Sequence, residues 1–180
     1  MQNELGLANN ITINFGDRSV IFKKYASFAV MTDTKEKLHT LCMDYVDERI
    51  ASAEQAIRAA RESANDDTKS SAGDKYETGR EMMQQEIDRN RKQLEESQKL
   101  KLVLDHIDAS KITDTIQNGS LVTTNFGKFY ISISKGQMRV DGNNYFAVSS
   151  VSPIGVKLMK QKEGVEFLFN GKNFRIEKIE

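Results

Sequence analysis

The sequence contains one cysteine, one proline and no tryptophan among its 180 residues. A single cysteine excludes a disulfide framework and a zinc site built from several cysteines. No apolar run approaches the roughly 20 residues that a helix needs to span a bilayer. Basic and acidic residues balance at 26 each, which argues against a strongly basic protein that wraps nucleic acid. These absences predict a cytoplasmic protein with no membrane partner.

The balanced total conceals three segments of different charge. Residues 1–32 carry a net charge of +1, residues 33–107 of −4 and residues 108–180 of +3. An apolar fraction of 38% is enough to build a core. Because each segment also has its own residue pattern, we expect separate modules.

The first segment matches neither of the other two. We interpret residues 1–32 as an N-terminal extension that is either non-native or poorly ordered. The alternative is an extension that pairs with a sheet edge, because residues 10–15 alternate between polar and apolar like a strand.

The middle segment has the composition and periodicity of long helices. Residues 33–107 lack proline and are rich in helix-forming residues. Alternating spacings of three and four are typical of a coiled-coil seam. The first such series is Met43, Val46, Ile50, Ala53, Ile57, Ala60 and Ala64, and the second is Met83, Ile87, Asn90, Leu94, Ser97, Lys101 and Leu104. We therefore predict a long antiparallel helical hairpin over 33–108, with a polar tip at about 63–75.

The open end of the predicted hairpin is more apolar than its middle. We expect one helix to meet the other there, and the second module to pack against the same place. The side chains concerned are Leu38, Leu41 and Tyr45 from the first helix and Leu100, Val103, Leu104 and Ile107 from the second.

The last segment predicts a small β-rich domain over 111–180. From Ser120 onward the apolar period becomes two, and glycine turns separate the predicted strands. Ser152 is expected to cap one short helix, with Pro153 in its first turn and an end near Gln161. Asn170-Gly171 predicts a type I′ hairpin turn. The predicted strands are 121–126, 128–134, 145–149, 165–169 and 174–179. The fold class is therefore α+β.

Several short motifs resemble one protein family. The stretch 148–159, Val-Ser-Ser-Val-Ser-Pro-Ile-Gly-Val-Lys-Leu-Met, is followed by Gly164 and a strand, and Asn118-Gly-Ser-Leu-Val-Thr123 precedes it. Ala59-Ala-Arg-Glu62 and Tyr76-Glu-Thr-Gly-Arg-Glu81 flank the predicted tip. Together these residues resemble the bacterial GreA/GreB family of transcription elongation (transcript-cleavage) factors, of which this chain would be a divergent member. The resemblance covers residues 33–180 and implies that the small domain is FKBP-like.

The resemblance also implies a function, namely transcription elongation by binding to bacterial RNA polymerase. In this family the hairpin enters the secondary channel of the polymerase, and carboxylates at its tip help to hold a second Mg²⁺ that activates the water cutting backtracked RNA. The small domain holds the channel rim, for which the matching residues are Ser152, Pro153, Ile154 and Gly155. The factor is not itself an enzyme and has no cofactor of its own. Nascent RNA and DNA are contacted only within the polymerase complex, by a monomer or a weak oligomer.

The predicted tip departs from the family pattern. The family carries two acids three residues apart, whereas here Asp67 matches the first acid and Ser70 replaces the second. We take Asp66 and Asp67 as candidate catalytic and Mg²⁺-directed acids, and Asp74 as a weaker candidate that also fits a helix cap. The alternative function is a non-cleaving inhibitor or modulator that binds in the channel.

Other classes of protein share some of these sequence features. A structural coiled-coil adapter with an FKBP-like domain is a second alternative. A peptidyl-prolyl isomerase would need an aromatic-lined pocket, whereas the phenylalanines here are more simply explained as core residues of strands. Cys42 and His39 could suggest a cysteine nucleophile or a metal pair. Without a third partner, a buried structural cysteine is the simpler interpretation.

Overall fold

The computed structural model describes the backbone of residues 18–66 and 74–180 and the side chains of residues 33–63 and 78–180. Within these residues two long helices precede a mixed six-stranded sheet, which confirms the α+β class. The predicted strand-like pattern at 10–15 lies outside the described residues. The elements are α1 (Arg18–Asp66), α2 (Asp74–Asp105), β1 (Leu121–Thr124), β2 (Gly127–Ser132), β3 (Gly136–Val140), β4 (Asn143–Ser149), α3 (Pro153–Leu158), β5 (Glu166–Phe169) and β6 (Lys172–Ile179).

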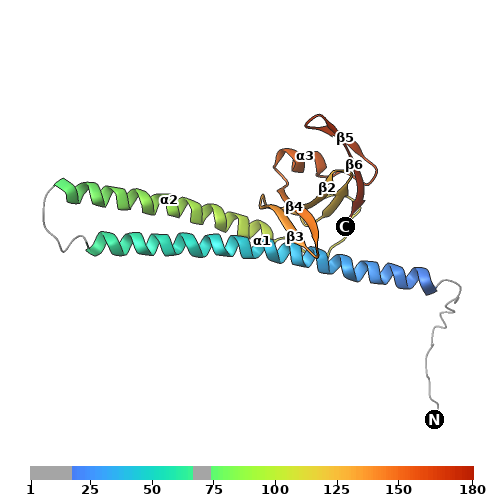
Figure 1. Ribbon diagram of the computed structural model, residues 1–180, viewed down its shortest axis with the longest axis horizontal. Helices are drawn as coiled ribbons and strands as arrows, with labels where there is room; N and C mark the ends of the chain where they lie inside the picture. Colours follow the sequence, from blue (N-terminus) through green and yellow to red (C-terminus); the bar gives the residue numbers. More distant parts are fainter. Residues whose placement is uncertain (1–17, 67–73) are drawn as a thin grey trace, which may run out of the picture.

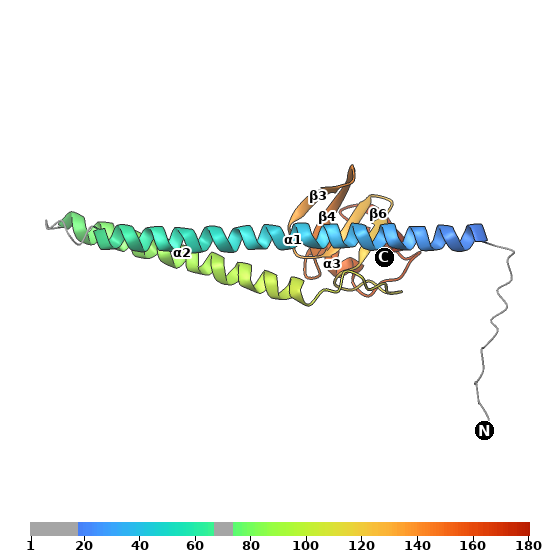
Figure 2. The ribbon, with the colours of Figure 1, turned by 90° about the horizontal axis from the view of Figure 1, so that it is seen from below.

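Helices α1 and α2 run in opposite directions alongside each other (Figures 1 and 2). The predicted seam lies between them, because the seam residues Val46, Ala53, Ile57 and Ala60 of α1 are buried together with Ile87, Asn90, Ser97 and Leu104 of α2. An ion pair also joins the two helices, with Lys101 Nζ 2.6 Å from Asp47 Oδ1. No helix of the described ranges is apolar over a stretch long enough to cross a membrane.

Helix α1 is longer than the sequence pattern suggested. It begins at Arg18 and not near residue 33, so about half of the expected extension is helical backbone. Residues 18–32 contain neither glycine nor proline, and nothing in them stops a helix that continues from residue 33. The alternating spacing of three and four begins later, because this spacing is needed only where a helix packs against a partner helix.

The sheet has the strand order β3-β4-β2-β1-β6-β5. Neighbouring strands are antiparallel except β2 and β4, which are parallel. Five strands were expected, and β3 is the additional one. Its five residues include only two buried apolar side chains, Met138 and Val140, so its alternation is too short to stand out in the sequence.

The turns and the short helix follow the sequence closely. Asn170 (φ 49°) and Gly171 (φ 74°) both have positive φ, as a type I′ turn requires. Helix α3 begins at Pro153 behind the Ser152 cap, as predicted. It ends at Leu158, three residues before the expected end, where the amide of Lys160 donates to the carbonyl oxygen of Ile116.

The two faces of the sheet belong to two different cores. On one face, α3 covers a cluster centred on Val122, Ile131, Leu158 and Ile176. On the other face, the base of the helix pair packs directly on the sheet, so both modules share one core. Its buried members are Leu38, Cys42, Val46, Leu104, Ile107, Leu121, Tyr130, Ile133, Met138, Val140, Tyr145 and Ala147.

Most of the side chains expected at the apolar end belong to this shared core. Leu41, Tyr45 and Leu100 pack against it. Val103 is the exception, because its side chain is 39% exposed on the outer side of α2.

Candidate functional site

The candidate acids belong to the end of the helix pair that lies farthest from the small domain (Figure 1). Asp66 is the last residue of α1 and Asp74 is the first residue of α2. Asp67 lies outside the described residues, and the side chains of Asp66 and Asp74 are not described either. The proposed carboxylate geometry and the proposed cap by Asp74 therefore stay predictions.

The second candidate site, Ser152–Gly155, consists of the N-cap and the first turn of α3, shortly after β4. Ser152 Oγ accepts a hydrogen bond from the amide of Gly155 (3.2 Å) and donates one to the carbonyl oxygen of Ser149 (2.6 Å). The side chain of Pro153 is exposed, whereas Gly155 is buried. A Cβ atom on Gly155 would lie only 2.0 Å from the carbonyl oxygen of Ser149. The fold itself thus requires the cap and the glycine, and Pro153 is the member of the turn that is free for a partner.

Cys42 is a buried structural residue, as expected. Its Sγ atom lies 3.7 Å from Ser132 Oγ and 3.7 Å from Met138 Sδ, both inside the shared core. Burial raises the pKa of the thiol above its ordinary value. This effect disfavours the thiolate that nucleophilic or metal-binding chemistry needs. No group of three or more histidine, cysteine, aspartate or glutamate side chains in the described ranges could hold a metal ion.

His39 is directed to a tyrosine and not to the cysteine. Its Nδ1 atom lies 3.3 Å from Tyr130 Oη, across the contact between α1 and β2. Burial lowers the pKa of the imidazole below its ordinary value of 6.5, and the charge of Asp105 partly offsets this. The His39–Tyr130 pair is therefore part of the joint between the modules and not of a reactive centre.

We expect this joint to make the protein less stable as the pH falls below neutrality. Because the unfolded chain binds a proton on His39 more readily than the folded chain does, the contribution of His39 is fully present above about pH 6.5 and is lost as the pH falls from that value through the lower pKa of the folded state. Urea unfolding between about pH 7.5 and pH 5.5 should show the loss, and His39→Gln should reduce it. The matched control is His106→Gln, an exposed position directly after the end of α2. An unchanged pH dependence in His39→Gln would contradict the prediction.

Lys35 is a buried polar residue that sequence reasoning missed. Its side chain is 1% exposed, and its Nζ atom donates to the carbonyl oxygen of Lys111 at 2.6 Å. Burial lowers the pKa of this ammonium group, while the charges of Glu180 and Asp108 act in the opposite direction. Lys35 thereby ties α1 to the connection between α2 and β1. Its position three residues before Leu38, on the same side of α1, was the signal that could have identified it.

A shallow cleft between α1 and β3 is the other place where charged side chains gather. Lys37 Nζ lies 2.6 Å from Asp33 Oδ2 and 3.0 Å from Asp141 Oδ2. These exposed pairs neutralise one another and attach the β3–β4 turn to α1. Such exposed pairs contribute little stability, because water screens them. The cleft therefore fits a structural contact better than a ligand site.

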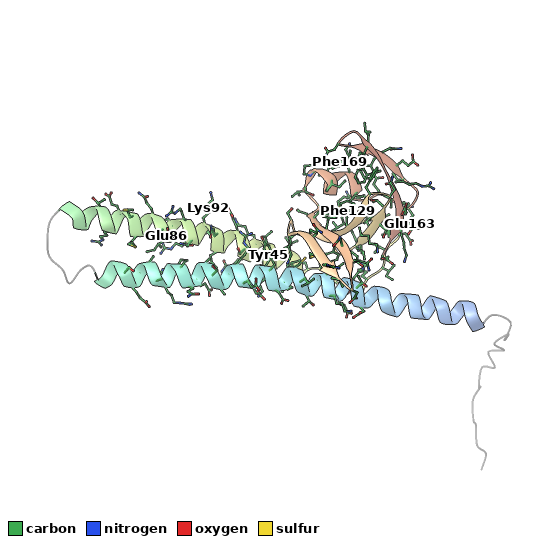
Figure 3. The ribbon with its side chains drawn as sticks, in the orientation of Figure 1. Tyr45, Glu86, Lys92, Phe129, Glu163 and Phe169 are labelled. Carbon is green, nitrogen blue, oxygen red and sulfur yellow. The ribbon has the colours of Figure 1, made fainter. Side chains whose placement is uncertain are left out.

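Side-chain placement outside the helix tip is shown in Figure 3, where Tyr45 lies at the junction of the two modules and Glu86 and Lys92 lie along α2. Three arginines flank the tip in the sequence and are exposed, namely Arg58, Arg61 and Arg80.

The comparisons with known proteins do not add a site, because no family model, no curated protein and no solved structure matches the chain.

Proposed function

We propose that the chain is a Gre-like transcription elongation factor that binds bacterial RNA polymerase through its secondary channel and modulates it. The observation that carries this proposal is the end of the helix pair: acids at the last residue of α1 and the first residue of α2 lie far from the small domain. Helix α2, with 32 residues at 1.5 Å each, is about 48 Å long. An arm of this length suits delivery of carboxylates to a recessed site.

The small domain would hold the factor at the channel rim. An FKBP-like identity is supported by a mixed, mostly antiparallel sheet with one short helix on one face. The contact with the polymerase would be formed by Ser152, Pro153, Ile154 and Gly155. The exposed apolar side chain in this contact would be that of Pro153. Val151 and Val156 beside it are 83% and 62% exposed, and they would enlarge that contact.

The chemistry would belong to the polymerase. Its second Mg²⁺ activates the water that cuts backtracked RNA, and a tip carboxylate would help to hold that ion. This chain would bring Asp67 and Asp66 to the centre, with Asp74 as a weaker candidate. Because Ser70 stands where the family has its second acid, a non-cleaving inhibitor or modulator of the polymerase is the alternative.

Binding to the polymerase is the first test of the proposal. A cognate core enzyme should retain the full chain in a pull-down at low salt and micromolar concentration. A variant with Pro153→Asp should bind more weakly, since it places a charge at the exposed apolar point without removing the Ser152 cap. The matched control is Lys162→Asp, also exposed in the small domain. Absence of any association would refute the proposed function.

The role of the tip acids requires a second test. In stalled, backtracked complexes at limiting Mg²⁺, Asp67→Asn should reduce RNA shortening more than Asp66→Asn does, while binding stays nearly unchanged. Asp44→Asn, an exposed position on the shaft of α1, is the control. If the double variant stimulates cutting at the wild-type rate, the tip acids have no catalytic role. If the wild type slows nucleotide addition and never shortens RNA, the protein is an inhibitor.

The coiled-coil adapter is the alternative from another class. An adapter would associate through the seam of its helices, but here the seam side chains of α1 and α2 are buried against each other within one chain. Sedimentation analysis separates the two proposals, because a monomer at micromolar concentration is expected for the elongation factor and a stable dimer for the adapter.

A further inference from the structure

All six phenylalanines after residue 33 gather in one cluster of the small domain. They come from the β1–β2 turn, β2, β4, β5 and β6, and Phe129 and Phe169 are labelled in Figure 3. Phe174 is the centre of the cluster, with four of the other rings at centroid distances of 4.8–6.3 Å. The six are Phe126, Phe129, Phe146, Phe167, Phe169 and Phe174.

The cluster is only partly covered. Phe174 is 7% exposed, whereas Phe126 is 47% exposed and the four remaining rings are half-buried. A single exposed apolar side chain is ordinary in a soluble protein. A set of adjoining, partly exposed rings is less so, because aromatic side chains contribute most when they are fully covered.

The exposed Phe126 ring packs against Phe174 at a centroid distance of 4.8 Å, and hydrogen bonds hold the turn that carries it. The amide of Phe126 donates to Thr124 Oγ1 at 3.2 Å, and that hydroxyl donates to the carbonyl oxygen of Gly127 at 2.9 Å. Asn125 ties the turn to β6, because its Oδ1 accepts from the amide of Arg175 and its Nδ2 donates to the carbonyl oxygen of Asn173. A ring fixed in this way loses little conformational entropy when a partner covers it.

The charge beside Phe126 is positive. Lys172 Nζ lies 5.3 Å from the centre of the Phe126 ring, and no carboxylate among the described residues forms an ion pair with it. Glu166, which faces Arg175 across the β5–β6 ladder, accepts a hydrogen bond from Asn173. Residues 108–180 carry a net charge of +3. An anionic partner with flat apolar groups would therefore complement this place.

We propose that this aromatic corner, defined as Phe126, Phe129, Phe174 and Lys172, binds single-stranded nucleic acid. A base stacks on the exposed Phe126 ring, and Lys172 contacts the adjoining phosphate. Stacking on aromatic side chains tolerates any base, and a nearby cation supplies the backbone contact. A duplex cannot offer an unstacked base face, so single strands are preferred. The proposal goes beyond the proposed function and does not depend on it, because the isolated chain binds without polymerase.

Fluorescence anisotropy of the full chain tests the proposal. The probes are labelled mixed-sequence RNA and DNA strands of about 12 nucleotides, and the duplex of the same sequence, at about 50 mM salt. Single strands should bind more tightly than the duplex. Phe126→Ala should weaken binding about tenfold, and Lys172→Gln should weaken it less and lower the salt dependence by about one phosphate contact. A preference for RNA over DNA, or the reverse, identifies which strand is the ligand.

Two further variants keep the test decisive. Phe126→Leu preserves an apolar side chain without an aromatic face, so it should also weaken binding if Phe126→Ala is too unstable to measure. Leu168→Ala, which truncates a 67% exposed side chain in the neighbouring β5, should bind like the wild type. The proposal is overturned by no binding at about 100 μM, by equal affinity for the duplex, or by wild-type binding in both Phe126 variants. If no single strand binds and a proline-rich peptide shifts the NMR resonance of Phe126, the corner is assigned to peptides instead.

Discussion

Gly155→Ala is expected to destabilise the protein by about 3 kcal/mol, because an added methyl group has no room. Its Cβ would lie 2.0 Å from the Ser149 carbonyl oxygen and 2.9 Å from Ser152 Oγ. The nearest obstacle is backbone at the end of β4, and this oxygen already accepts hydrogen bonds from both the amide and the hydroxyl of Ser152. Making room for the methyl group would therefore break the turn that positions α3.

Urea unfolding of the full chain measures the effect. Ser152→Ala removes the cap without adding volume and should cost about 1 kcal/mol, so it separates the loss of the cap from the clash. Val156→Ala, one residue after the glycine and 62% exposed, is the matched control and should be nearly neutral. If Gly155→Ala is as stable as Val156→Ala, the close approach does not constrain the fold. The glycine would then be a better candidate for a direct contact with the polymerase.

Leu104→Ala is expected to destabilise both modules together, by about 3 kcal/mol. Leu104 is fully buried on α2 and belongs to the core that includes Tyr130 and Met138 of the sheet. Truncation of its side chain leaves a cavity at the place where helices and sheet meet. Since that core is continuous, the unfolding transitions of the small domain and of the helix base should move by the same amount.

The same helix supplies the control for this prediction. Leu102→Ala makes the same chemical change two residues earlier, at a side chain that is 59% exposed, and should change stability by less than about 0.5 kcal/mol. The sequence pattern predicted a separate small domain over 111–180. In the isolated segment, the sheet face that carries Tyr130 would no longer be covered by the helix pair. We therefore expect that segment to show no cooperative melt. A cooperative melt of the isolated segment, or a small domain unaffected by Leu104→Ala, would contradict this expectation.

The sequence was most informative where structure depends on near neighbours. The three-and-four spacing predicted most of the buried side chains of α1 and α2, since that spacing places them on one side of each helix, whereas the buried Lys35 and Cys42 lie outside the predicted series. Ser152 before Pro153 predicted the start of α3, and Asn170-Gly171 predicted a turn with two positive φ angles. Each of these features is decided within a few residues of the chain.

The sequence was least informative where distant segments meet. Strand β3 was missed because it depends on pairing with β4 and on cover from α1, and its five residues carry little pattern of their own. Val103 was expected to be buried, yet it is exposed, because the sheet covers only one side of the α2 base. The start of α1 was placed too late, because a helix needs no partner pattern in order to continue.

For the candidate site too, some features follow from the sequence and others only from the tertiary structure. The sequence by itself determined the order of the modules, the seam, the cap at Ser152 and the positions of Asp66, Asp67 and Asp74 along the chain. Only the tertiary structure decided that Gly155 is needed for a close backbone approach, that Lys35 is buried against the Lys111 carbonyl group and that Phe126 is held at the surface. The physical reason is that Lys35 and Phe126 contact atoms far away in sequence, in Lys111 and Phe174, whose approach is set by the packing of the helix pair and the sheet. The close approach at Gly155 is set by the way the chain folds back onto Ser149, six residues earlier, which no local period encodes.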